Sequence, residues 1–142
     1  MNWDQFTDLI AESLTDDLLS PPYRKVKAQH PKTDAAFGHC YVASEAAYHL
    51  LGGRKEGWTP QFVRVAGYAH WYLKHKSGFI FDPTASQFKI PIPYHQGRGT
   101  GFLTNKPSKR CRQLIHQIGV SRTWYALKNS DALDIQFPKI TL

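Results

Sequence analysis

The stretch HWYLKHKSGFIFDPT, residues 70–84, decides the fold of this chain. Two runs rich in aromatic and aliphatic residues, which favour β-strands, flank a Lys-Ser-Gly loop that ends at Gly78. A three-residue hairpin loop with a left-handed glycine places Tyr72 opposite Asp82. His70, two residues before Tyr72, then shares a face with Asp82 at a diagonal distance of about 7–8 Å. A two-residue loop would put these two side chains on opposite faces, so the loop length decides whether they meet.

Hydrophobic periodicity predicts further elements around this hairpin. Apolar residues at three- and four-residue steps predict an amphipathic helix over residues 3–19, which Ser20-Pro21-Pro22 ends. A second helix is expected to open at Cys40 and to run to Leu51, where Gly52-Gly53 ends it. The other expected elements are a polar connector over 23–38, strands over 59–66, 68–74 and 78–82, an edge strand over 88–94, a glycine-rich loop over 96–101, a helix over 107–118, and short strands over 124–127 and 135–137.

Length and composition bound the class of protein. The chain has 142 residues, 42% of them hydrophobic, which is enough for one core without disulfide or metal support. We expect a single domain over 1–142, with an N-terminal helix (1–20), a core that carries the chemistry (37–88) and a basic helix (106–119). No apolar run is long enough to span a membrane, and Asp4 does not suit a signal peptide. A cytoplasmic protein with free thiols is expected, of a size compatible with a phage or other accessory gene product.

Three residues form a candidate nucleophilic site. Cys40 lies at the start of a predicted helix, where unpaired N–H groups and the helix dipole stabilise a thiolate. His70 can pair with this thiolate as an imidazolium and later protonate a leaving amine. Asp82 on the other ring nitrogen would fix the tautomer and orientation of the imidazole. The order of the three, with a hairpin joining the last two, predicts a catalytic triad that attacks a carbonyl group.

The same residues carry a resemblance to a known group of enzymes. Gly38-His39-Cys40 at a helix start, the strand over 59–67, His70-Trp71, and the ending Asp82-Pro83-Thr84 resemble transglutaminase-like cysteine enzymes of the papain-like superfamily. The resemblance covers residues 37–88 and implies an α+β fold with a papain-like core, in which a helix bearing the cysteine packs on an antiparallel sheet bearing the histidine and aspartate. It also implies acyl transfer on an amide, peptide or isopeptide bond through a thioester, by hydrolysis, deamidation or transamidation and without a cofactor.

The sequence indicates the residues that contact the oxyanion and the substrate less clearly than it indicates the triad. The backbone N–H of Cys40 is one expected oxyanion donor. Trp71 follows His70 directly, so strand alternation turns it to the opposite face, where it is either core or a wall of the site. The loop over 96–101 would line a substrate cleft. The candidates for oxyanion or substrate binding are His39, Gln61, Trp71, Tyr94 and Arg98.

Charge and motif spacing leave two functions open. Lys and Arg outnumber Asp and Glu by 18 to 11, and the basic runs at 24–27 and 106–112 could face nucleic acid, an acidic protein or solvent. The cysteines and histidines lack zinc-site spacing, so no metal is expected, and residues 96–101 lack the ending of a phosphate-binding loop. The first function is a cysteine hydrolase, peptidase or transglutaminase-like enzyme acting on a protein, peptide or other amide, with the basic residues steering it to an acidic partner. The alternative is a non-catalytic binding module of the same fold that uses the basic runs to bind nucleic acid or an acidic protein partner.

Overall fold

The computed structural model describes residues 1–30, 32–34, 36–102, 104–129 and 133–137. It combines helices with one antiparallel sheet of strand order β3-β2-β1-β4, which confirms the α+β class. The helices are α1 (Trp3–Ser13), α2 (Pro21–Gln29), α3 (Cys40–Leu50), α4 (Lys109–Gly119) and α5 (Arg122–Leu127), and the strands are β1 (Trp58–Val65), β2 (Tyr68–His75), β3 (Ile80–Phe81) and β4 (Arg98–Gly99). Short 3-10 turns are η1 (Asp16–Leu18), η2 (Gly53–Glu56), η3 (Ala85–Gln87) and η4 (Tyr94–Gln96).

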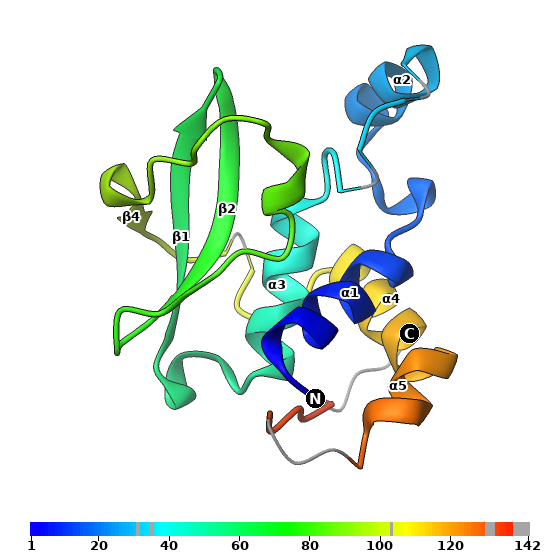
Figure 1. Ribbon diagram of the computed structural model, residues 1–142, viewed down its shortest axis with the longest axis vertical. Helices are drawn as coiled ribbons and strands as arrows, with labels where there is room; N and C mark the ends of the chain where they lie inside the picture. The colour runs from blue at the N-terminus through cyan, green and yellow to red at the C-terminus, as the bar shows by residue number, and fades with distance from the viewer. Residues whose placement is uncertain (31, 35, 103, 130–132, 138–142) are drawn as a thin grey trace.

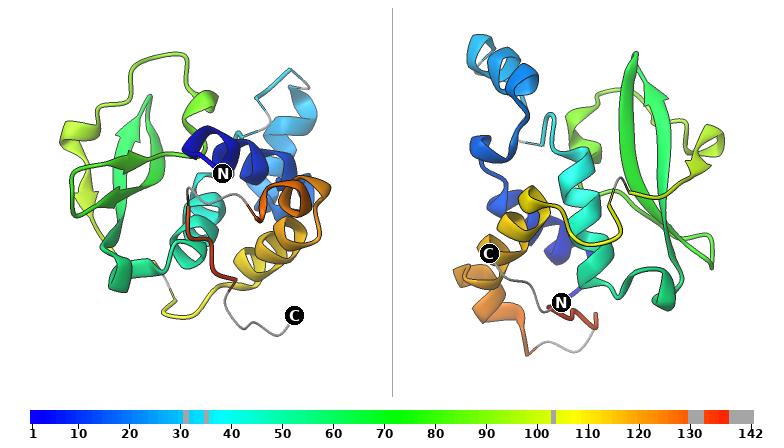
Figure 2. Two further views of the ribbon diagram at one scale, coloured as in Figure 1. Left: turned by 60° about the horizontal axis from the view of Figure 1, so that its bottom comes forward. Right: turned by 180° about the vertical axis from the view of Figure 1, so that it is seen from behind.

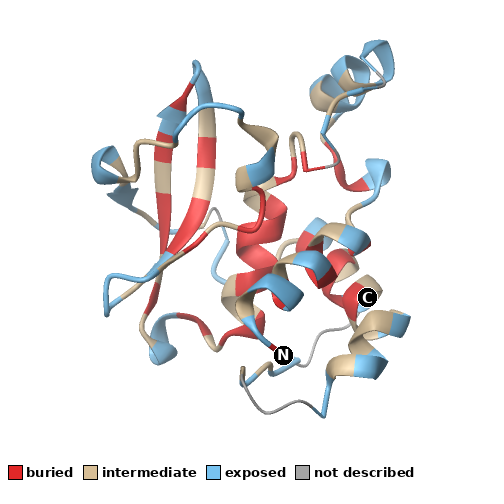
Figure 3. Ribbon diagram, in the orientation of Figure 1, coloured by how far each residue is buried: buried red, intermediate tan, exposed pale blue. Residues whose placement is uncertain are grey.

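The sheet forms one layer of the molecule, and α1, α4 and α5 gather on the other side. The helix α3 lies between the sheet and these helices (Figure 1, Figure 2). The buried residues of α3 include Ala43, Ala46 and Ala47, and most of the helix is buried (Figure 3). Small side chains let a helix approach its neighbours closely, and one core joins Leu73 of β2, Phe81 of β3, Phe6 of α1 and Leu114 of α4 around α3. By contrast, α2 projects from this body and buries none of its residues (Figure 1).

The β2–β3 hairpin has the register expected for a three-residue loop. Leu73 pairs with Phe81, and the His75 N–H donates to the Phe79 carbonyl at 2.8 Å. Gly78 has a φ of 94°, in the left-handed region that glycine adopts most readily. The predicted register is confirmed. Because Phe81 points into the core around α3, alternation directs the next residue, Asp82, to the opposite face of the sheet.

The N-terminal third differs from the expected elements. The first helix ends at Ser13 rather than near residue 19, and η1 follows it after two residues. The pair Pro21-Pro22 does not separate a helix from a connector but begins α2, because proline is well accommodated in the first turn of a helix. The expected connector over 23–38 is therefore helical as far as Gln29.

The C-terminal half also differs in several places. Residues 88–94 form no paired strand, since Pro91 and Pro93 lack the N–H that a ladder needs, and the expected loop over 96–101 contributes β4, which pairs with β1. The helix expected from residue 107 starts at Lys109 with Ser108 as its N-cap. Residues 124–127 are helical, and 135–137 are irregular. No helix in the described part of the chain is long and apolar enough to cross a membrane.

Candidate active site

The candidate nucleophile lies at the first residue of α3. Its N-cap is His39, and the Ala43 N–H closes the first turn on the His39 carbonyl at 2.9 Å. The amide of Cys40 precedes that bond and is one of the donors that a helix start leaves available. Gly38 allows this start, because it has a φ of 78° and an added Cβ would lie 2.9 Å from Leu19 Cδ2. The tight turn at Gly38 thus presents the thiol at a helix end.

His70 and Asp82 form a buried pair on the hairpin. Nε2 of His70 lies 2.6 Å from Oδ2 of Asp82, and the side chains are 0% and 4% exposed. Burial lowers the pKa of His70, but hydrogen bonds to Asp82 and to Cys40, with the charges of both, outweigh it and raise the pKa to about 9. The imidazole is therefore held as an imidazolium near neutral pH, with one nitrogen on the carboxylate.

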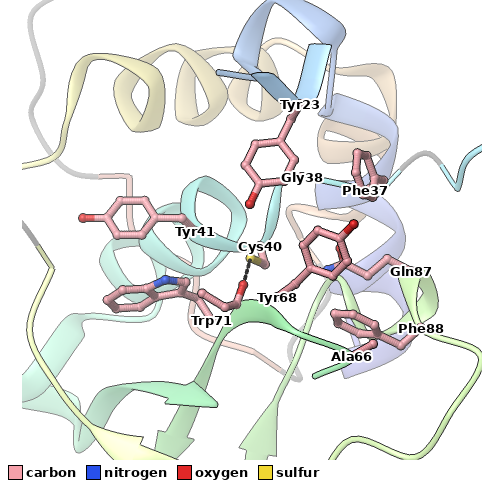
Figure 4. A pocket seen from close by; sticks show the side chains of 11 residues that line it. Tyr23, Phe37, Gly38, Cys40, Tyr41, Ala66, Tyr68, Trp71, Gln87 and Phe88 are labelled. Atoms are coloured by element: carbon pink, nitrogen blue, oxygen red, sulfur yellow. Dashed lines mark hydrogen bonds between the residues drawn. The ribbon is translucent and has the colours of Figure 1, made fainter. Parts of the chain in front are cut away.

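The thiol reaches this pair because α3 begins beside β2. Sγ of Cys40 lies 3.7 Å from the carbonyl oxygen of Ala69, the residue before His70, and the thiol donates to it (Figure 4). Cys40 is partly exposed, whereas His70 lies fully buried behind it. The three residues expected to form a triad, Cys40, His70 and Asp82, are thus brought together from α3, β2 and the segment after β3.

Two further side chains lie against the pair. The hydroxyl of Tyr94, a residue expected to contact substrate, donates to Oδ2 of Asp82 at 2.7 Å. Gln87 lies beside the imidazole, with its Nε2 3.5 Å from Nδ1 of His70 and donating to Oγ1 of Thr84 at 3.2 Å. Sequence reasoning missed Gln87. The turn η3 brings it back toward His70, and the only sequence signal is the turn chemistry of Asp82-Pro83-Thr84.

A cavity of about 240 Å³ opens in front of Cys40. Trp71 forms one wall and packs edge-on against Tyr41 with ring centroids 4.8 Å apart, while His70 turns to the other face of β2, as alternation requires. Tyr23 reaches from α2 with its hydroxyl directed toward the start of α3 (Figure 4). The aromatic lining consists of Tyr23, Phe37, Tyr41, Tyr68, Trp71 and Phe88. This cavity accommodates an apolar or planar group beside the thiol.

Three other predicted site residues lie outside the cavity lining. His39 is fully buried, its ring nitrogens have no hydrogen-bond partner among the described residues, and burial lowers its pKa to about 4. Gln61 is buried in β1, paired with Tyr72 and with Gly99. Arg98 is exposed on β4, at the sheet edge opposite to β3. None of the three lines the cavity that holds Cys40.

A second cluster of titratable groups joins α3 to α4. Potential ligand atoms of Glu45, His49 and Cys111 lie within 4.8 Å of one another. Both carboxylate oxygens of Glu45 are already used, because they accept from the Ser108 N–H at 2.8 Å and from its hydroxyl at 2.6 Å. Burial raises the pKa of the Cys111 thiol, which makes it a poor nucleophile or ligand. This cluster fixes the start of α4 against α3.

No protein-family model, curated protein or solved structure matches the chain. The likeness to transglutaminase-like enzymes therefore stays a prediction from the motif residues of the sequence.

Proposed function

We propose that this protein is a cysteine-dependent acyl-transfer enzyme, with Cys40 as nucleophile, His70 as acid and base, and Asp82 as the group that orients His70. One observation carries the proposal. Nε2 of His70 and Oδ2 of Asp82 lie 2.6 Å apart in a buried site, and the Cys40 thiol at the start of α3 interacts with the same imidazole, whose Nδ1 also faces Gln87. A carboxylate on one ring nitrogen and a thiol beside the imidazole are what an acid–base histidine needs.

The finer fold assignment belongs to the same proposal. A papain-like core sets a cysteine at a helix start against an antiparallel sheet that carries the histidine and the acid. The chain has the cysteine at the first residue of α3, the histidine on β2 and the aspartate directly after β3. The order along the chain and the buried His70–Asp82 contact support a transglutaminase-like arrangement.

The reaction follows from these positions. The Cys40 thiolate attacks an amide carbonyl carbon, a C–S bond forms, and the carbonyl electron pair moves to oxygen, where the Cys40 N–H can stabilise it. As the tetrahedral intermediate collapses, the C–N bond breaks and the His70 imidazolium gives its proton to the leaving nitrogen. Water or an amine then attacks the thioester, His70 takes the proton from it, and Cys40 leaves as the thiolate.

The alternative, a non-catalytic binding module, accounts less well for the pair. Burying two ionisable groups costs solvation energy, and a hydrophobic pair of similar volume would serve a scaffold as well or better. The side chains of His70 and Asp82 are buried, so they cannot contact a macromolecule bound at the basic runs over 24–27 and 106–112.

Turnover of amides tests the proposal. Peptide and glutamine-containing substrate libraries, assayed with water and with a primary amine as acceptors, should give product with the wild-type protein. Cys40→Ala should give none, while Cys111→Ala, which removes the other thiol, should keep the activity because that thiol is buried and protonated. A Cys40→Ala protein with undiminished turnover would contradict the proposal.

A further inference from the structure

A second cavity adjoins the one that holds Cys40. It measures about 420 Å³ and shares Tyr23, Gly38 and Tyr41 with the first. The two adjoining cavities, together called the groove, extend from the thiol past the start of α3 to the first turn of α4. Leu18 and Val42 line its middle part, so this stretch is apolar.

The far end of the groove is basic. Lys109 and Arg110 line it, are exposed, and form no salt bridge with any carboxylate in the described part of the chain. Glu45 forms no salt bridge with either of them, and its two oxygens accept from the Ser108 N–H and hydroxyl instead. Cations in the first turn of a helix also oppose the helix dipole, so the stability of α4 does not explain them.

On the basis of the proposed function, we infer that this groove binds the chain of an acidic peptide or protein substrate beside the reacting amide. The start of α4 is anchored at Glu45, which lies five positions after Cys40 in α3, a rise of about 7.5 Å. A carboxylate that reaches Lys109 or Arg110 is then roughly two to four extended residues from the acylated position, at about 3.3 Å per residue. Charge at the groove end and the apolar middle together define a substrate with an acidic residue flanking an apolar segment.

Charged alkylating peptides test this inference. The probes are chloroacetyl peptide amides with one, two or three glycines followed by Glu, each matched by a Gln probe of the same length. The Cys40 thiolate displaces chloride from each, and mass spectrometry gives the rate constant at Cys40. Proteins are the wild type, Lys109→Glu/Arg110→Glu, and a control, Lys55→Glu/Lys76→Glu, that changes the net charge equally near the opposite end of α3.

At one length or more, the Glu probe should label wild-type Cys40 about threefold faster than the Gln probe, as expected for exposed charge pairs. The preference should shrink in 0.5 M salt, persist in the control, and reverse in Lys109→Glu/Arg110→Glu. Equal rates for Glu and Gln probes with rapid labelling would overturn the inference and leave the proposed function intact. Cys40 labelling no faster than free cysteine with any probe would instead contradict the proposed function. Protection of Cys40 by a single-stranded oligonucleotide, without a Glu preference, would assign the cations to nucleic acid and overturn the inference.

Discussion

Asp82 has two hydrogen-bond partners at a single oxygen. Nε2 of His70 lies 2.6 Å from Oδ2, and the Tyr94 hydroxyl donates to the same atom at 2.7 Å. A carboxylate held from two directions cannot rotate without losing both bonds, so Tyr94 acts through Asp82 on the orientation of His70. We therefore expect Tyr94 to act as a positioning residue rather than to touch substrate.

Tyr94→Phe should slow alkylation of Cys40 by iodoacetamide by about three- to tenfold. The variant removes a hydrogen bond to a charged group, worth roughly 1.5–3 kcal/mol, and only part of that reaches the imidazole. The rate constant for Cys40, measured by mass spectrometry, gives the effect, and the midpoint of thermal unfolding shows whether the fold is kept. The control is Tyr125→Phe, at a tyrosine that is 61% exposed. Unchanged labelling in Tyr94→Phe would exclude a positioning role.

At the scale of elements, the hairpin could be predicted from the sequence because its determinants are local. The loop ending at Gly78 fixes the register, and the register alone places His70 and Asp82 on one face. The predictions for two other segments were wrong, because local sequence signals there favour more than one structure. The two prolines at 21–22 indicated a stop, yet Ser20 and the prolines begin a helix. Trp124 and Tyr125 indicated a strand, but Ser121 accepts from the Trp124 N–H and starts a helix there.

The turn before α3 allows a direct test of how the site is assembled. Gly38→Ala should destabilise the protein more than Gly67→Ala. Both glycines have positive φ, 78° and 82°, so each alanine meets the backbone cost of about 1–2 kcal/mol. Only at position 38 would the new Cβ also crowd its neighbours, Leu19 at 2.9 Å and Tyr23 at 3.0 Å, whereas nothing lies within 4 Å at Gly67.

Urea unfolding should therefore show an additional loss of about 1 kcal/mol or more for Gly38→Ala. The rate of Cys40 alkylation should fall in Gly38→Ala and stay unchanged in Gly67→Ala, because the turn at Gly38, unlike the turn at Gly67, leads directly into Cys40. Equal losses of stability in the two variants, with equal labelling, would show that the close approach of Tyr23 and Leu19 is not needed for the site.

At the scale of the whole molecule, the site lies where the helical layer meets the sheet. The three residues of the proposed triad could be named from the sequence, because a helix start, a strand and a hairpin end are each local patterns. The surroundings could not, because they depend on packing between distant segments. Tyr23 reaches the cavity only because α2 exists, and Gln87 reaches His70 only through η3. For His39, Gln61 and Arg98, residue type indicated function, but the fold puts them outside the cavity.

The most direct test of the triad is the rate of iodoacetamide alkylation of Cys40 against pH, in the wild type and in His70→Ala. The raised pKa of His70, about 9, keeps the imidazolium charged from acidic pH through neutrality and up to that value. A thiolate paired with it should react rapidly at pH 6, where a free cysteine is less than about 1% ionised. His70→Ala should be at least about tenfold slower there, and buried Cys111 should react slowly in both proteins. Superimposable pH profiles for the two proteins would contradict the account.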